Sequence, residues 1–129
     1  MPNYWFDHVH LISPDPLKTA DFYEKTFGAK RDSLNELPDG RILVSVTLDN
    51  ASIKVTNPRP KPLVPNTLPN GCGLEHFGLG TDNLEEAVAE LKANGLKCVQ
   101  EIKEVSPTMK IAYFVSPEDI LIELLEFSS

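Results

Sequence analysis

Two histidines, His8 and His76, occupy matching positions in two halves of the chain, and histidine is the side chain that most often binds a metal ion. Each stands in a short stretch of alternating character that precedes a helix-like stretch. An Asp, a Leu and a Gly recur around each helix-like stretch at one offset of 67 residues, and the histidines are 68 apart. A duplicated unit would bring two imidazoles to equivalent places, where they can converge on one metal ion. The recurring pairs are Asp15 and Asp82, Leu17 and Leu84, and Gly28 and Gly95.

Three other side chains could take part in chemistry. Glu123 lies in the apolar stretch 120–125, where burial of an unpaired carboxylate would be costly. A bound metal would remove that cost, and so would a position on an exposed edge strand. His10 shares a strand face with His8 and is either a substrate contact or a structural histidine. Arg41 shares a face with Ser45 and could meet an anionic substrate, although a solvated charge is the common alternative.

The composition excludes several classes of function. The chain has 129 residues, which suits one domain, and its formal net charge of −7 argues against nucleic-acid binding. It contains no apolar run of membrane-spanning length, and its N-terminus lacks a basic stretch followed by an apolar signal core. We therefore expect a cytoplasmic protein with no membrane partner. The two cysteines, Cys72 and Cys98, form no metal-binding motif and are expected to be unpaired thiols.

The first half of the sequence predicts a strand, a helix and three further strands. Alternation predicts a strand over 6–12, and Asp15 with Pro16 and Gly28 would cap a helix over 17–27. The apolar stripe of that helix comprises Leu17, Ala20, Phe22, Tyr23 and Phe27. Strands follow over 31–37, 41–48 and 52–56.

The second half repeats this order after a proline-rich segment. Five prolines between residues 57 and 70 exclude a helix or a central strand there. A strand over 74–80 follows, and then a helix over 84–94 whose start is marked by a capping-box pattern of Asp82 and Glu85. Strands over 97–105, 109–116 and 120–127 complete a second βαβββ module. We expect Val9, Leu11, Phe77 and Leu79 to pack beneath the two helices.

Four stretches together resemble the vicinal oxygen chelate superfamily of glyoxalases, bleomycin-resistance proteins and extradiol dioxygenases. They are Asp-His-Val-His-Leu (7–11), Phe-Tyr-Glu-Lys-Thr-Phe-Gly (22–28), Glu-His-Phe-Gly-Leu (75–79) and Ala-Tyr-Phe-Val-Ser-Pro-Glu-Asp-Ile-Leu-Ile-Glu-Leu (112–124). The resemblance implies an α+β fold in which two βαβββ modules form a curled mixed sheet, a cup with both helices on its outer face. One domain would contain module one (5–57), a linker (58–70) and module two (71–129).

The resemblance also implies a ligand set for one divalent metal ion. Members of the superfamily take ligands from the first and last strands of each module, which places His8, His76 and Glu123 at three ligand positions. Lys54 occupies the fourth, where glyoxalases and epimerases often carry Glu or Gln, and its ammonium has no lone pair for a metal. Lys54 is a substrate-anchoring cation, a substitute for the metal that pairs with Glu123, or a solvated lysine. The ion could be Fe, Ni, Zn, Mn or Co.

Two histidines and one carboxylate form the ligand set of non-haem iron oxygenases, so the set resembles extradiol dioxygenases more than glyoxalase I. Tyr113 falls where ring-cleaving relatives place a tyrosine, and it is either a pocket-lining residue or a proton donor. Phe114 is expected to contact the substrate. His10 is the remaining histidine for a catalytic base, and Glu123 is the carboxylate that glyoxalase-type chemistry would use.

These features predict a metal-dependent enzyme, a lyase, an isomerase or a ring-cleaving dioxygenase, acting on a small molecule with vicinal oxygens. The alternative is a metal-free binding protein of the bleomycin-resistance type. The resemblance also suggests a homodimer.

Overall fold

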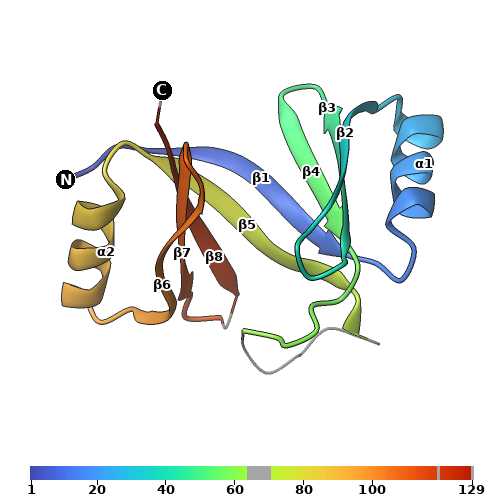
Figure 1. Cartoon of the computed structure of the whole chain (residues 1–129). Coiled ribbons are helices and arrows are strands. Elements are labelled where there is room, and N and C mark those ends of the chain that lie inside the picture. Colours follow the sequence, from blue (N-terminus) through green and yellow to red (C-terminus); the bar gives the residue numbers. More distant parts are fainter. Residues whose placement is uncertain (64–70, 119, 129) are drawn as a thin grey trace. The chain divides into compact units, whose positions relative to one another are not determined.

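A computed structural model describes residues 1–63, 71–118 and 120–128. Its elements follow the predicted order, βαβββ twice, with boundaries within two residues of those expected (Figure 1). The part of the proline-rich linker that contains Pro65 and Pro69 lies outside the described residues. The elements are β1 (Tyr4–Ile12), α1 (Pro16–Phe27), β2 (Lys30–Glu36), β3 (Ile42–Leu48), β4 (Ala51–Thr56), β5 (Gly73–Thr81), α2 (Leu84–Ala93), β6 (Lys97–Ser106), β7 (Met109–Val115) and β8 (Leu121–Phe127).

The chain divides into two compact units. The first unit is His8–Glu75, and the second unit is Met1–Asp7 together with His76–Ser129. Strand β1 contributes residues to both, and the strand order is β2-β3-β4-β1-β5-β8-β7-β6 in one eight-stranded mixed sheet. The predicted α+β fold of two βαβββ modules is therefore confirmed. The N-terminal segment, however, groups with the second module and not with its own.

The first unit builds its core between α1 and one face of its sheet. Strand β3 runs antiparallel to β2 and β4, and β1 runs parallel to β4. The alternation of β3 directs Val44 and Val46 into this core, where they meet Ala20 of α1 and Val55 of β4. Leu11 of β1 packs against the same cluster, as expected. The opposite face of β1 is left to His8 and His10.

The helical stripe of α1 is narrower than the sequence indicated. Phe22 and Phe27, although they belong to the apolar stripe, are 51% and 57% exposed. The Phe22 ring packs edge-on against Phe27 and Tyr23, and the Phe27 ring stacks on Tyr23, which packs against the core. The predicted ends of the helix are confirmed: Asp15 accepts a hydrogen bond from the Lys18 backbone N–H, and Gly28 has the left-handed φ of 77° that closes the helix.

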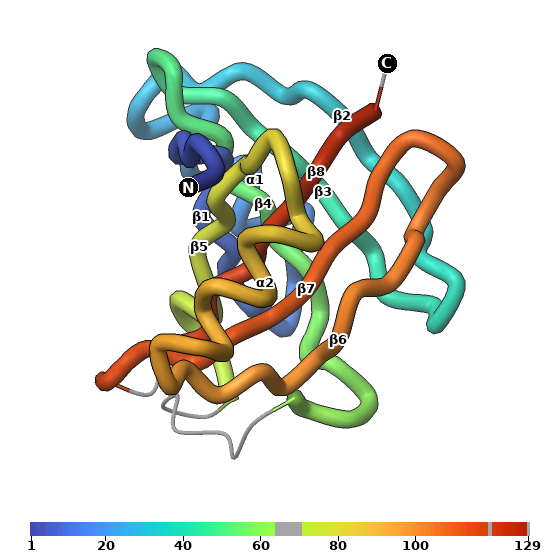
Figure 2. The backbone as a smooth tube through the Cα atoms, turned by 90° about the vertical axis from the view of Figure 1, so that its left-hand side faces the viewer, coloured from blue at the N-terminus to red at the C-terminus, as the bar shows by residue number. Residues whose placement is uncertain are grey.

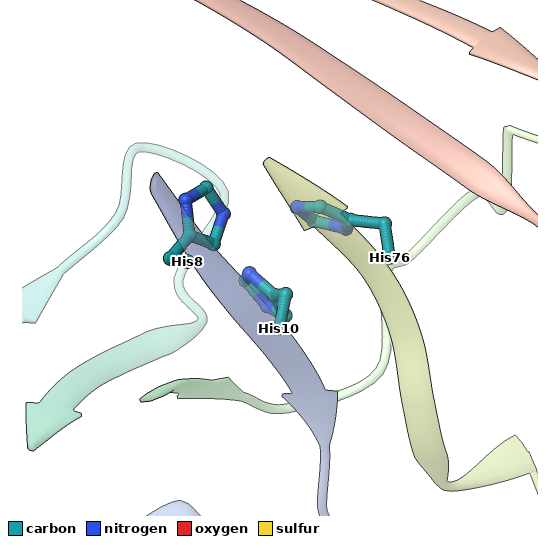
Figure 3. Close-up of side chains that lie close together, drawn as sticks. All are labelled: His8, His10 and His76. Carbon is teal, nitrogen blue, oxygen red and sulfur yellow. The ribbon is translucent and has the colours of Figure 1, made fainter. Parts of the chain in front are cut away.

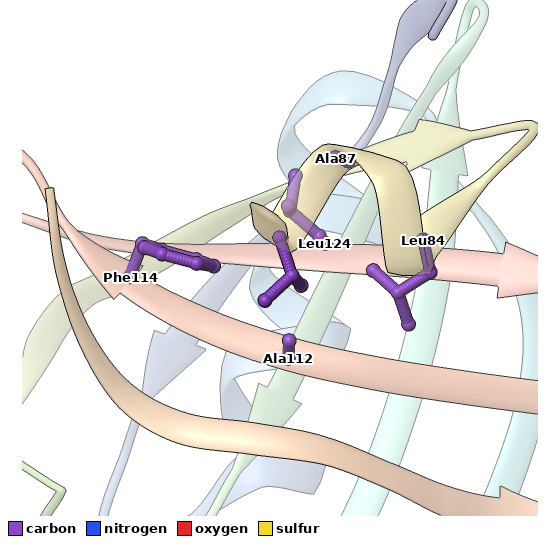
Figure 4. Close-up of a cluster of buried hydrophobic side chains, with 6 residues drawn as sticks. Leu84, Ala87, Ala112, Phe114 and Leu124 are labelled. Atoms are coloured by element: carbon purple, nitrogen blue, oxygen red, sulfur yellow. The ribbon is translucent and has the colours of Figure 1, made fainter. Parts of the chain in front are cut away.

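The second unit repeats this plan around α2. Strand β5 runs parallel to β8, while β7 is antiparallel to both β8 and β6; the β6–β7 hairpin is easily followed in Figure 2. Its core holds Leu84, Ala87 and Val88 of α2 against Ala112, Phe114 and Leu124 of the sheet (Figure 4). Leu79 packs at the margin of this cluster, as expected, whereas Phe77 stacks on Phe6 at a ring-centroid distance of 6.4 Å.

The cap of α2 is one residue later than predicted. Asn83 is the N-cap, because its side-chain oxygen accepts a hydrogen bond of 3.1 Å from the Glu86 backbone N–H. Asp82 instead accepts two hydrogen bonds from Asn3, one from its backbone N–H and one from its side-chain amide, at 3.0 and 2.8 Å. These bonds lower the pKa of the Asp82 carboxyl. They also fasten the N-terminal segment to the second unit.

We expect Asn83→Ala to lower the free energy of unfolding by about 1 kcal/mol, the usual contribution of an N-cap side chain. Asn83→Asp keeps an oxygen acceptor and is the matched control, expected to stay close to the wild type. Urea unfolding of the three proteins measures the difference. If Asp82→Ala lowered the free energy of unfolding and Asn83→Ala did not, Asp82 would be the N-cap, as the sequence predicted.

Two other features of the chain bear on its class. Neither helix among the described residues is long and apolar enough to cross a membrane. Cys72 and Cys98 are both free, as expected. Burial and the nearby Glu101 carboxylate raise the pKa of the Cys98 thiol, which keeps it protonated and unreactive.

Candidate metal centre

His76 and Glu123 meet on one face of the second unit. They lie on the parallel strands β5 and β8, where Gly78 is the register partner of Glu123 and His76 stands two residues earlier. The His76 Nε2 and Glu123 Oε1 atoms are 3.2 Å apart. Both side chains are buried, with exposed fractions of 1% and 6%. The surface alternative for Glu123 is therefore wrong, and the His76 imidazole is one of its partners.

Tyr113 joins the same face from β7. It is the register partner of Glu123, and its ring packs edge-on against the His76 imidazole at a centroid distance of 5.3 Å. Three residues singled out in the sequence, His76, Tyr113 and Glu123, are thus brought together within one unit. The Tyr113 ring is therefore in contact with one of the two candidate ligands and is next in register to the other.

Phe114 is on the opposite face of the same strand. It is fully buried beneath α2 with Leu84 and Leu124, and successive side chains of a strand point to opposite faces. Its ring therefore belongs to the core, and the prediction that Phe114 contacts a substrate is corrected. The adjacent Tyr113 carries the aromatic surface on the ligand face.

The first unit holds two buried histidines on the corresponding face of β1. His8 and His10 have ring centroids 6.3 Å apart and exposed fractions of 1% and 8%. Figure 3 shows both rings on β1 and the His76 ring on β5. The His10 Nε2 atom is 2.8 Å from the Thr56 hydroxyl oxygen. Each of the three histidines therefore offers a ring nitrogen that is sheltered from bulk water.

Lys54 occupies the position in the first unit that Glu123 occupies in the second. His10 pairs in register with Lys54, two residues after His8, just as Gly78 pairs with Glu123, two residues after His76. The internal repeat inferred from the sequence is thus present in the hydrogen-bonding register. The Lys54 ammonium lies 3.3 Å from the Ser45 hydroxyl oxygen, and it forms no ion pair with a described carboxylate of its unit.

Two arginines have partners that their sequence context did not reveal. The Arg41 backbone N–H and guanidinium both bond Asp39, and they lower the pKa of that carboxyl. Arg59 forms an ion pair of two hydrogen bonds with Glu75, at 3.0 and 3.1 Å. The signal for that pair was weak, because its partners are 16 residues apart across the proline-rich segment.

The His76–Glu123 pair suits a divalent metal. Two ligand atoms each about 2.1 Å from one ion are about 3.0 Å apart at a right angle and about 3.4 Å apart at a tetrahedral angle. The observed 3.2 Å lies between these values. An imidazole nitrogen and a carboxylate oxygen are also donors that iron, zinc, nickel, manganese and cobalt accept. The residues present therefore fit such an ion.

Comparison with known proteins places the chain in a family. Residues 5–124 match the model of the Glyoxalase/Bleomycin resistance protein/Dioxygenase superfamily. The human mitochondrial methylmalonyl-CoA epimerase is 30% identical over 92% of this chain and 71% of its own length. The Dictyostelium discoideum epimerase is 28% identical over 93% of this chain and 76% of its own length. The chain belongs to this superfamily, as the resemblance of its motifs had indicated.

Solved structures give the same fold. A hypothetical protein from Bacillus halodurans C-125 aligns with a TM-score of 0.82 at 20% identity, over 98% of this chain and 96% of the other. A Streptomyces coelicolor methylmalonyl-CoA epimerase in complex with 2-nitronate-propionyl-CoA aligns with a TM-score of 0.76 at 21% identity, over 96% and 97% of the two chains. At this level of identity the likeness supports the glyoxalase-like fold.

Proposed function

We propose that the chain is a divalent-metal-dependent isomerase that moves a proton at a carbon next to a carbonyl group. The observation that carries the proposal is the buried His76–Glu123 pair, at a spacing that fits two ligands of one ion. The relatives that are 28–30% identical are named epimerases, which favours isomerisation over lyase or ring-cleaving chemistry. The substrate would be a small acid or acyl thioester with two oxygens placed to chelate the ion.

His76 and Glu123 would hold the ion from the second unit, and His8 is the third proposed ligand. The support for His8 is its place in the repeat: it matches His76 in sequence, in register and in burial. A bound ion would draw charge from the substrate carbonyl and so acidify the neighbouring C–H bond. The choice among Fe, Ni, Zn, Mn and Co is left to metal analysis.

Three residues would act on the substrate itself. His10, hydrogen-bonded to Thr56, is an imidazole that can accept a proton and return it. Tyr113 can donate a hydrogen bond from the face that it shares with Glu123. The Lys54 ammonium, which contacts the Ser45 hydroxyl, can pair with a substrate carboxylate. Arg41 is a weaker candidate for this last role, because its guanidinium is already paired with Asp39.

Methylmalonyl-CoA is the first substrate to test. In D2O, the metal-loaded protein should replace the proton between the two carbonyl groups with deuterium, and proton NMR follows the loss of that signal. Removal of the metal by a chelator should stop the exchange, and adding it back should restore the exchange. His10→Gln should retain the metal and slow the exchange by at least about a hundredfold, the usual contribution of a general base.

The outcomes separate the candidate functions. Stoichiometric metal without exchange would reject this substrate, and oxygen uptake with a catechol would then favour a ring-cleaving dioxygenase. A purified protein that binds no divalent ion would support the metal-free binding protein. A homodimer stays a prediction of the family resemblance, and light scattering on the purified protein tests it.

A further inference from the structure

We infer that Trp5 forms an aromatic wall beside the candidate metal centre and contacts the organic group of a chelating ligand. This inference rests on the proposed metal-dependent function and adds to it a residue that selects the substrate. Trp5 lies in the N-terminal half of β1, within the second unit. It is the only tryptophan of the chain.

The indole of Trp5 lies directly on the backbone of Gly80. A Cβ atom added at Gly80 would stand 2.1 Å from the Trp5 Nε1 atom and 2.4 Å from Cε2, so only glycine leaves room for the ring. Gly80 belongs to β5, in which residues 76, 78 and 80 share a face. The missing Cβ points to the face that carries the His76 imidazole. Trp5 therefore covers that face.

A second contact fixes the same segment. Phe6, the next residue of β1, stacks on Phe77, whose side chain points to the other face of β5. The segment is also held in place by the two hydrogen bonds from Asn3 to Asp82.

Along β5 the wall stands one strand repeat from the register position of Glu123 and two strand repeats from His76. Gly78 is the register partner of Glu123, and Gly80 follows it by two residues, a rise of about 7 Å along the strand. Trp5 is 47% exposed, which leaves much of its indole surface available for contact. A ligand that chelates the ion through two oxygens would project its organic group across this distance. An aromatic or extended acyl group would then stack on the indole.

Two hydroxamates test this arrangement, because acetohydroxamate and benzohydroxamate chelate a metal through the same pair of oxygens and differ in the attached group. The metal-loaded wild type should bind benzohydroxamate about five- to tenfold more tightly, in line with aromatic stacking, and its tryptophan fluorescence should change. Trp5→Ala should reduce this preference at least threefold, and Trp5→Phe should retain most of it. Gly80→Ala should resemble Trp5→Ala, because its Cβ displaces the indole.

Phe6→Ala is the matched control, since it removes an aromatic ring of the same segment on the other face; it should leave the preference unchanged. Metal content measured in every variant separates the two proposals. If the purified wild type takes up no divalent metal and binds neither hydroxamate, the proposed function is rejected. Equal preference in the wild type and Trp5→Ala, with metal bound to both, would overturn the role of Trp5 alone.

Discussion

Replacement of either Glu123 or His76 by alanine is expected to reduce the bound divalent metal from about one ion per chain to a small fraction. His76 and Glu123 are buried donors 3.2 Å apart, and each substitution removes one of the three proposed ligands. The two ligands that remain do not suffice for tight binding of such an ion. His8→Ala should have the same effect if the third ligand comes from β1. Metal analysis after dialysis against a metal-buffered solution measures the stoichiometry.

Tyr113→Phe is the control for this experiment. It keeps the ring that packs on His76 and removes only the hydroxyl, so it should retain the metal. Thermal unfolding of the metal-free proteins shows whether a variant has lost the metal because it has lost the fold. The site is rejected if the alanine variants at all three positions keep the stoichiometry of the wild type.

The sequence singled out His76 through the internal repeat, and it singled out Glu123 through its apolar setting and the family resemblance. The histidines were matched by the recurrence of neighbouring residues, and the register of both units now shows the same spacing from each histidine to Lys54 or Glu123. The burial of Glu123 could not be predicted in this way. An apolar stretch with one carboxylate fits a buried strand and an edge strand equally well, and only the neighbouring strands decide between them.

The errors also have physical causes. Around Tyr113 and Phe114 nearly every residue is apolar, so a period of two assigns neither face, and the pairing of Tyr113 with Glu123 is needed. At α2 both Asp82 and Asn83 are good N-caps, and each has a glutamate three residues later. The competing bond from Asn3, 79 residues away, leaves Asn83 as the cap. The local sequence around α2 cannot indicate a hydrogen-bond partner that is so distant in the chain.

The same limitation explains why Trp5 escaped notice. Its role depends on Gly80, and a glycine in a strand indicates close approach of another group without naming that group. Trp5 and Gly80 are far apart in the sequence, and they meet because β1 and β5 are neighbouring strands of the sheet. The predicted first module began at residue 5, whereas the segment Met1–Asp7 groups with the second unit.

Lys54→Gln is expected to strengthen metal binding at least about tenfold, which corresponds to about 1.4 kcal/mol. In the first unit Lys54 is the register partner of His10, so it is a diagonal neighbour of the proposed ligand His8. A cation at that position repels a divalent ion bound by His8, and its ammonium has no lone pair to donate. Glutamine removes the charge and adds an amide oxygen that can coordinate the ion.

Lys54→Met separates these two contributions, because it removes the charge without adding a ligand atom. If repulsion dominates, both variants gain affinity to a similar extent; if coordination dominates, only glutamine does. Both variants should also raise the KM for a substrate that carries a carboxylate, since the anchoring ammonium is lost. A wild type that binds no metal beside a Lys54→Gln variant that does would show that the lysine replaces the ion. Changes below about 0.5 kcal/mol in metal affinity and stability would mean that Lys54 is only a solvated charge.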